Sequence, residues 1–164
     1  VSYRSSIGAL DVPAYLFQPL TPGPARSRAA LVWVHGGVHG NWSIGMFPFV
    51  KEAVARGYIV IAPEYRGSTG YGKAHHMAID YGGYEVDDVL TAGDYLKTLG
   101  PGDPARIGIM GWSQGGRLAL LTAGRNDVFT SVLTCAGAYD QKGNEEEQYE
   151  IAKKNGCYYE VTYS

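Results

Sequence analysis

A serine flanked by glycines is the residue of this chain best suited to chemistry. Residues 111–115 are Gly-Trp-Ser-Gln-Gly, and they directly follow the apolar run 107–110. A serine in this pattern, between a buried strand and a helix, is typical of a nucleophile elbow. The glycines leave room for neighbouring backbone, which a Cβ would obstruct. We therefore predict acyl transfer, in which Ser113 Oγ attacks a carbonyl while a general base removes its proton. An ordinary strand-to-helix turn is the alternative.

A nucleophilic serine also needs hydrogen-bond donors for the oxyanion that forms. The elbow supplies one, the backbone N–H of the residue after the nucleophile, which is Gln114 here. The second is expected from a loop after an earlier strand, and His-Gly-Gly at 35–37 follows such a strand. Losing one donor costs about 2.7–4 kcal/mol of transition-state stabilisation. We expect His35 itself to hydrogen-bond the loop rather than to act as a base.

The base and the acid are harder to find. The four histidines of the chain all lie between positions 35 and 76, before Ser113. Enzymes with this elbow place the acid and the histidine after the serine. Asp140, at the end of the strand predicted to follow, is our candidate for the acid. His75, His76 or another subunit is the proposed source of the base, although a surface position explains both histidines better.

Strands and helices are expected to alternate along the chain and to position these residues. Short apolar runs predict buried strands, and apolar residues at helical spacing predict amphipathic helices. The expected strands are 12–17, 31–34, 58–62, 107–110, 128–136 and 158–163. The expected helices are 46–56, 85–99, 114–123 and 145–155. The alternation predicts an α/β fold, with a mostly parallel sheet flanked by helices.

Four segments together resemble a known family. They are His-Gly-Gly at 35–37, the glycine-rich loop 65–72, Asp-Tyr-Gly-Gly at 80–83 with aspartates at 87 and 88, and the elbow at 111–116. In this order and at these intervals they are similar to the catalytic domain of the prolyl oligopeptidase family of α/β-hydrolases. The resemblance extends over about residues 10–140.

The resemblance implies an α/β-hydrolase core of eight strands, a Ser-Asp-His triad and hydrolysis of peptide or ester bonds. It makes Ser113 the nucleophile, with Gln114 and Gly37 as donors of the oxyanion hole. Asp87 and Asp88 match only as structural anchors of the helix that they begin.

The end of the chain departs from the family pattern. Residues 147–164 resemble the later helix and the last strand of the family, and relatives carry the catalytic histidine in the loop just after that strand. No apolar run stands where the strand with the acid is expected. We therefore expect a single α/β-hydrolase-like domain over 1–164, with an internal deletion near 140–145 and without the C-terminal histidine segment.

Two classes of function fit these observations. The first is a serine hydrolase that acts on ester or peptide carbonyls through an acyl-enzyme at Ser113. The alternative is a catalytically incomplete or silent protein that serves as a binding or interaction module on the same scaffold. Labelling by a fluorophosphonate separates the two, because only an activated serine reacts.

The amino-acid composition limits the classes of partner and cofactor that we expect. A net charge of −2 gives no reason to expect nucleic acid or an anionic membrane surface. The two cysteines are too few for a disulfide scaffold or a zinc site, and we expect no metal or cofactor and a buried Cys135. The sequence shows no signal peptide and no apolar run as long as the roughly 20 residues that a membrane span needs. We therefore expect a cytoplasmic location, with secretion as the alternative. Uncovered apolar surface on a shortened sheet predicts a homo-oligomer.

Overall fold

The computed structural model describes residues 1–21 and 23–136. Several expectations lie outside these residues: the helix 145–155, the strand 158–163, the deletion near 140–145 and the candidate acid Asp140. The remaining predicted elements can be compared directly.

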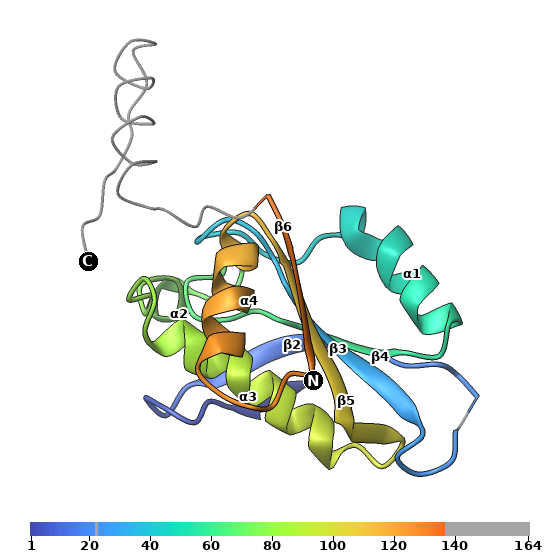
Figure 1. Ribbon diagram of the computed structural model, residues 1–164. Helices are drawn as coiled ribbons and strands as arrows, with labels where there is room; N and C mark the ends of the chain where they lie inside the picture. The colour runs from blue at the N-terminus through green and yellow to red at the C-terminus, as the bar shows by residue number, and fades with distance from the viewer. Residues whose placement is uncertain (22, 137–164) are drawn as a thin grey trace.

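The described residues contain six strands in one sheet (Figure 1). They are β1 (Ser2–Arg4), β2 (Asp11–Phe17), β3 (Arg28–Val34), β4 (Ile59–Pro63), β5 (Gly102–Trp112) and β6 (Ser131–Cys135), in the spatial order β1-β2-β4-β3-β5-β6. Strands β4, β3, β5 and β6 are parallel to one another, and β1 and β2 add antiparallel pairings at one end. The predicted mostly parallel sheet is confirmed.

Helices cover both faces of this sheet (Figure 1). The short 3-10 helix η1 (Ile44–Met46) leads into α1 (Phe47–Ala55) on one face, and α3 (Tyr84–Thr98) and α4 (Gln114–Gly124) pack side by side on the other. The single turn α2 (Lys73–His76) lies in the connection after β4. No helix in the described part of the chain is both long and apolar enough to span a membrane.

Local sequence explains where α1 and α3 begin and end. Pro48 lies in the first turn of α1, where its missing N–H costs no hydrogen bond, and Gly57 adopts a φ of 91° just after the helix. Glu85 and Asp87 lie in the first turn of α3, and Lys97 lies in its last turn. These charges complement the helix dipole.

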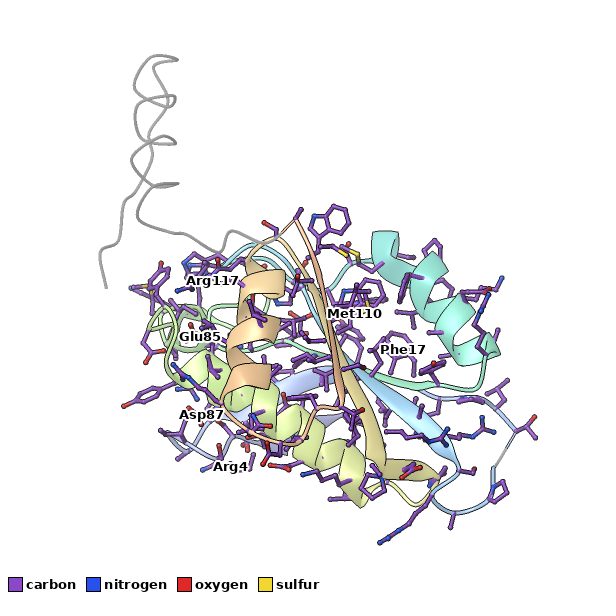
Figure 2. All side chains as sticks on the ribbon, in the orientation of Figure 1. Arg4, Phe17, Glu85, Asp87, Met110 and Arg117 are labelled. Carbon is purple, nitrogen blue, oxygen red and sulfur yellow. The ribbon has the colours of Figure 1, made fainter. Side chains whose placement is uncertain are left out.

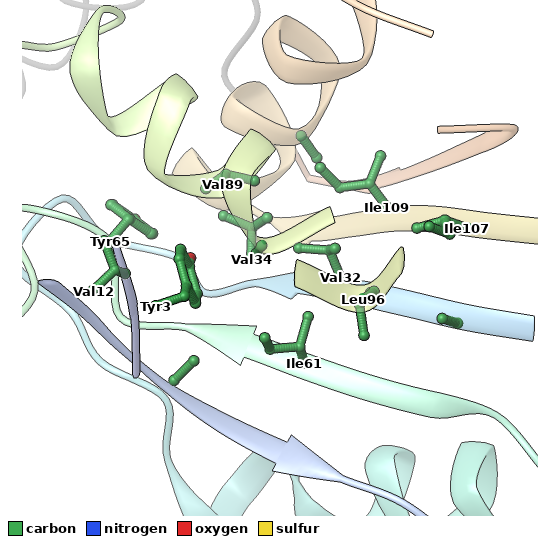
Figure 3. Packing of buried hydrophobic residues seen from close by; sticks show 14 of the residues in the cluster. Tyr3, Val12, Val32, Val34, Ile61, Tyr65, Val89, Leu96, Ile107 and Ile109 are labelled. Atoms are coloured by element: carbon green, nitrogen blue, oxygen red, sulfur yellow. The ribbon is translucent and has the colours of Figure 1, made fainter. Parts of the chain in front are cut away.

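Side chains of the central strands divide the core into two clusters, because successive strand residues point to opposite faces. The cluster beneath α3 and α4 contains Val32, Val34, Ile61, Ile107, Ile109, Val89 and Leu96 (Figure 3). The cluster beneath α1 contains Trp33, Val50, Val60, Ala62 and Met110, and Phe17 packs against it. Figure 2 shows Met110 and Phe17 on the α1 side. The central strands β4, β3 and β5 are therefore buried on both faces.

Element boundaries differ from the expectation in several places. β5 begins at Gly102 rather than at 107, because Gly102 pairs with Arg28 across a register shift in β3. β6 covers Ser131–Cys135 rather than 128–136, since Val128 packs onto the core before the strand starts. β1 and α2 were not expected, and both are short. Cys135 is half-buried rather than buried.

Candidate active site

Three loops meet at one edge of the sheet. Strands β4, β3 and β5 are neighbours and parallel, so their carboxyl ends lie side by side. The loop after β3 begins at His35, the loop after β4 begins at Glu64, and β5 leads directly into Ser113. Ligands of open α/β sheets bind at this edge. The topology therefore gathers the three glycine-rich segments singled out in the sequence.

Ser113 has the backbone of a nucleophile elbow. Its φ of 55° and ψ of −122° lie outside the helical and strand regions, which costs a residue with a Cβ about 1–3 kcal/mol. Its N–H donates to the Cys135 carbonyl at 2.8 Å, and its own carbonyl accepts from the Gly116 N–H at 2.9 Å. The half-buried side chain makes no capping hydrogen bond to α4. The turn therefore presents Oγ without engaging it in the helix.

The elbow and the His-Gly-Gly loop are in direct backbone contact. A Cβ at Gly36 would lie 2.8 Å from the carbonyl oxygen of Trp112 and 3.4 Å from Ser113 Cβ. A Cβ at Gly115 would overlap the carbonyl oxygen of His35. Only glycine permits this approach from both sides. The contact places the loop next to Ser113.

The two predicted oxyanion donors lie on either side of that contact. Gln114 is the first residue of α4, and the first N–H groups of a helix have no partner within the helix. Gly37 has a φ of 71°, in the left-handed region that favours glycine. Their roles as donors stay a prediction.

The His35 ring lies buried beneath the loop. Its Nδ1 is 3.1 Å from the Gly36 carbonyl oxygen, and because a carbonyl only accepts, Nδ1 carries the proton. Its Nε2 lies 2.8 Å from Ser68 Oγ. Burial lowers the pKa of His35 to about 4, so the ring is neutral at pH 7. These contacts are those of a residue that holds the loop, as the sequence predicted.

Glu64 is a buried carboxylic acid that the sequence analysis missed. Its Oε1 accepts from the Trp42 N–H at 2.7 Å, at the far end of the His-Gly-Gly loop. Its Oε2 lies 3.8 Å from His35 Nε2 and has no hydrogen-bond partner among residues 1–21 and 23–136. Burial raises the pKa of Glu64 to about 7. An acidic residue two positions after the apolar run 58–62 was the available signal.

The two histidines considered as bases lie in α2. His75 is buried, so the expectation of a surface position is wrong for it. Its Nε2 lies 3.0 Å from the Glu64 carbonyl and 3.1 Å from the Tyr65 carbonyl, which draw the ring inward. His76 is half-buried, and its ring stacks on His39 with 3.7 Å between centroids. Both rings therefore contact the loops around the site.

Neither a base nor a metal site is found around Ser113 in the described residues. All four histidines of the chain belong to this part of it, and none of them hydrogen-bonds to the Ser113 hydroxyl. Nor do the described residues bring three or more His, Cys, Asp or Glu side chains together as metal ligands. Within residues 1–21 and 23–136, Ser113 lies against the His-Gly-Gly loop, and no histidine hydrogen-bonds to it.

A buried ion pair fixes the loop after β4 to α3. Arg66 Nη2 lies 2.7 Å from Asp88 Oδ1, and Arg66 Nε lies 2.8 Å from Asp88 Oδ2. The side chains are 4% and 0% exposed. Ser5 Oγ donates to Asp88 Oδ1 at 2.6 Å, and the Tyr3 hydroxyl donates to the Asp88 carbonyl at 2.8 Å. Asp88 is thus the structural anchor that the resemblance implied.

The acidic residues at the start of α3 also have structural contacts. Glu85 is buried and accepts from the Gly82 N–H, and Asp80 Oδ1 accepts from the Tyr84 N–H at 2.7 Å. Burial, with the neighbouring Asp80 carboxyl, raises the pKa of Glu85 to about 7. Figure 2 shows Glu85 on α3 and Arg117 on the adjacent α4. Glu85 and Asp80 hold the turn 80–83, and no hydrogen bond between described residues connects either of them to the elbow.

The sequence of this chain matches the prolyl oligopeptidase family over residues 46–158, more than half of its length. The chain belongs to the prolyl oligopeptidase family. The resemblance inferred from the motifs is confirmed, and so is the α/β-hydrolase fold. The family is one of serine peptidases, which confirms at that level the expectation of an enzyme.

Individual relatives agree with this assignment. The "Uncharacterized peptidase YuxL" of Bacillus subtilis is 31% identical over 137 residues, 82% of this chain and 21% of that protein. The dipeptidyl-peptidase 5 of Porphyromonas endodontalis is 31% identical over 142 residues, 82% of this chain and 20% of that protein. The chain thus spans about a fifth of the length of the curated relatives it matches.

Solved structures share the same core. A puromycin-hydrolyzing peptidase of Mycobacterium tuberculosis matches with a TM-score of 0.76 and 31% identity, over 89% of this chain and 23% of that one. A puromycin hydrolase matches with a TM-score of 0.76 and 26% identity, over 87% of this chain and 22% of that one. The fold of this prolyl oligopeptidase family member is therefore that of solved hydrolases.

Proposed function

We propose that this chain provides the nucleophile and the oxyanion hole of a serine peptidase, with Ser113 forming an acyl-enzyme on a peptide carbonyl. The observation that supports it most is the contact between the strained turn at Ser113 and the loop at Gly36. Membership of a peptidase family favours a peptide amide, and an ester carbonyl is the alternative substrate.

The proposed reaction follows the usual order for a serine nucleophile. Ser113 Oγ attacks the carbonyl carbon and loses its proton to a general base. The carbonyl oxygen becomes negative in the tetrahedral intermediate, and the N–H groups of Gln114 and Gly37 donate to it. The intermediate collapses, the protonated base gives its proton to the leaving amine or alcohol, and water then hydrolyses the acyl-serine ester.

The proposal assigns the base to α2 or to another subunit, with Asp140 as the acid. Nε2 of His75 directs its proton at two carbonyls, so only Nδ1 of that ring could accept one. His76 has no such carbonyl contact among the described residues, which makes it the better candidate in α2. Loss of activity in His76→Ala would identify it, and full activity in both His75→Ala and His76→Ala would move the base to another subunit.

A non-catalytic binding module is the second candidate function. What favours it is that none of the four histidines hydrogen-bonds to Ser113 Oγ. The two candidates differ in whether a covalent intermediate forms. We expect acid-quenched mixtures with a p-nitrophenyl ester or a peptide p-nitroanilide to contain an acylated Ser113 by mass spectrometry. Ser113→Ala is the matched control. Equal amounts of acylated protein in wild type and in this variant would contradict the proposed acyl-enzyme.

The partner expected besides a small peptide or ester is a second copy of the chain. β6 is one of the two edge strands of the described sheet, and its side chains Val132 and Leu133 are 43% and 53% exposed. They line an apolar groove of about 440 Å³ against Phe49 of α1. Exposed apolar edges favour association. A dimer by light scattering at micromolar concentration is expected, and a monomer would contradict it.

A further inference from the structure

We propose that the Tyr65 hydroxyl is a positioning group for the oxyanion hole, because it holds the carbonyls of His35 and Gly37 and so fixes the peptides on both sides of the one that carries the Gly37 N–H. This rests on the proposed role of Gly37 as a donor. Tyr65 lies on the loop after β4, outside both the His-Gly-Gly loop and the elbow. Its side chain is 1% exposed, so the hydroxyl acts from beneath the site.

The hydroxyl bridges two carbonyls. Tyr65 Oη lies 3.2 Å from the His35 oxygen and 3.1 Å from the Gly37 oxygen. A phenol has one hydrogen, so the two carbonyls share it in a three-centre bond. Burial raises the pKa of Tyr65 well above its ordinary value, which keeps that hydrogen in place. One side chain therefore fixes two peptide groups of the loop.

The Gly36 carbonyl, which lies between those of His35 and Gly37 in the chain, is held by the His35 ring. His35 Nδ1–H donates to the Gly36 carbonyl at 3.1 Å, and the His35 ring stacks on the Tyr65 ring with 4.4 Å between centroids and 14° between planes. In a trans peptide the C=O and the following N–H point in opposite directions, and no described peptide is cis. Holding the Gly36 carbonyl on the imidazole therefore directs the Gly37 N–H away from that ring.

Tyr65 is itself anchored. Its carbonyl accepts from the Ser68 N–H at 3.0 Å and lies 3.1 Å from His75 Nε2. The next residue, Arg66, is tied to α3 through its buried ion pair with Asp88. Donors that are held in place before the reaction need no reorganisation when charge develops. The Tyr65 hydroxyl thus links the rigid part of the fold to the loop that would bind the oxyanion.

Tyr65→Phe removes the hydroxyl and keeps the ring that stacks on His35. The carbonyls of His35 and Gly37 then lose a buried donor, and their peptides can rotate. We expect kcat to fall about 10- to 100-fold, less than the 10²–10³-fold loss seen when a donor is removed outright. KM is expected to change by less than about twofold, because oxyanion donors act mainly on the transition state.

Tyr3→Phe is the matched control. The Tyr3 side chain is 7% exposed, and its hydroxyl donates to a backbone carbonyl, that of Asp88, at 2.8 Å. Tyr3→Phe therefore reproduces the loss of a buried phenol hydroxyl without removing a contact to the His-Gly-Gly loop. A kcat of Tyr65→Phe equal to that of wild type or of Tyr3→Phe would overturn the proposal.

Nuclear magnetic resonance separates this proposal from the proposed function. We expect the amide signals of Gly36 and Gly37 to shift in Tyr65→Phe and to stay in place in Tyr3→Phe, and unchanged signals in both variants would overturn the positioning role. If wild type has no turnover, the proposed function fails while this comparison still decides the role of Tyr65. Should Tyr65→Phe not fold, wild type alone provides the test: the Tyr65 hydroxyl proton is expected to exchange slowly and to show contacts to these amides, and its rapid exchange would overturn the proposal.

Discussion

The backbone of Gly36 lies so close to the carbonyl oxygen of Trp112, the residue before Ser113, that it leaves no room for a Cβ. A methyl group at this position would lie 2.8 Å from that oxygen and 3.4 Å from Ser113 Cβ. The first of these distances is shorter than a relaxed carbon–oxygen contact. The spacing between the loop after β3 and the elbow after β5 therefore depends on the absence of one side chain.

Gly36→Ala is expected to push the loop away from the elbow. Because an oxyanion donor must lie within hydrogen-bond distance of the developing charge, kcat should fall by about 10²–10³-fold. Steady-state hydrolysis of a p-nitrophenyl ester measures this change. Gly124→Ala is the control, since a Cβ there would meet no atom within 4 Å and the residue ends α4, about 16 Å along the helix from Ser113. Equal activity of the two variants would contradict the arrangement of the site.

Ser113→Gly is expected to be more stable than Ser113→Ala by about 1 kcal/mol. Alanine keeps the Cβ that is strained at a φ of 55°, whereas glycine relieves it and loses part of the gain through the greater entropy of the unfolded chain. Urea unfolding of both inactive variants measures the difference. An alanine variant as stable as the glycine variant would mean that the elbow is unstrained.

Asp88→Ala is expected to lower the free energy of unfolding by about 3–5 kcal/mol, because it leaves the Arg66 guanidinium buried without its partner. Asp11→Ala is the matched control. This variant breaks the ion pair between Asp11 and Arg4, whose side chains are 68% and 58% exposed respectively. The free energy of unfolding should fall by less than about 1 kcal/mol. Chemical denaturation of both variants checks this contrast. Similar losses in the two would contradict the anchoring role of Asp88.

Glu64→Gln is expected to change the pH dependence of stability. Burial raises the pKa of Glu64 from 4.5 to about 7, so between these values the folded protein binds more protons at this site than the unfolded chain. The contribution of Glu64 to stability is therefore lost as the pH rises through this window, by up to about 3 kcal/mol. The free energy of unfolding of wild type minus that of Glu64→Gln should fall from pH 4.5 to pH 7.

The opposite sign is expected for His35→Gln. Burial lowers the pKa of His35 from 6.5 to about 4, so the unfolded chain binds more protons at this site between these values. The free energy of unfolding of wild type minus that of His35→Gln should therefore rise between pH 4 and pH 6.5. Unfolding curves at several pH values measure both differences. A flat difference for Glu64→Gln, or slopes of the same sign for the two variants, would contradict the description of this buried pair.

Most of the fold follows from apolar patterns along the sequence. The run 107–110 and the run 58–62 predict central strands because they are apolar on both faces, and the structure buries them between two helix layers. The ends of β5 and β6 were placed wrongly because pairing with β3 and packing of Val128 decide them. Such contacts join residues far apart in the chain, and local pattern does not contain them.

The site was predicted unevenly for a similar reason. Motif spacing points to Ser113, Gln114 and Gly37 because a tight turn and an oxyanion loop demand glycines at fixed positions. The buried roles of Glu64 and Tyr65 depend on which loop packs beneath which, and they became visible only in three dimensions. Sequence spacing gave no indication that Tyr65 holds the loop.

The central claim is that Ser113 is an activated nucleophile, and covalent labelling tests it most directly. We expect a fluorophosphonate to modify the wild-type chain at a single site, which peptide mapping by mass spectrometry places on Ser113. Ser113→Ala should remain unmodified under the same conditions. An unmodified wild type, in conditions that fully label a control serine hydrolase, would contradict the claim and favour the binding module.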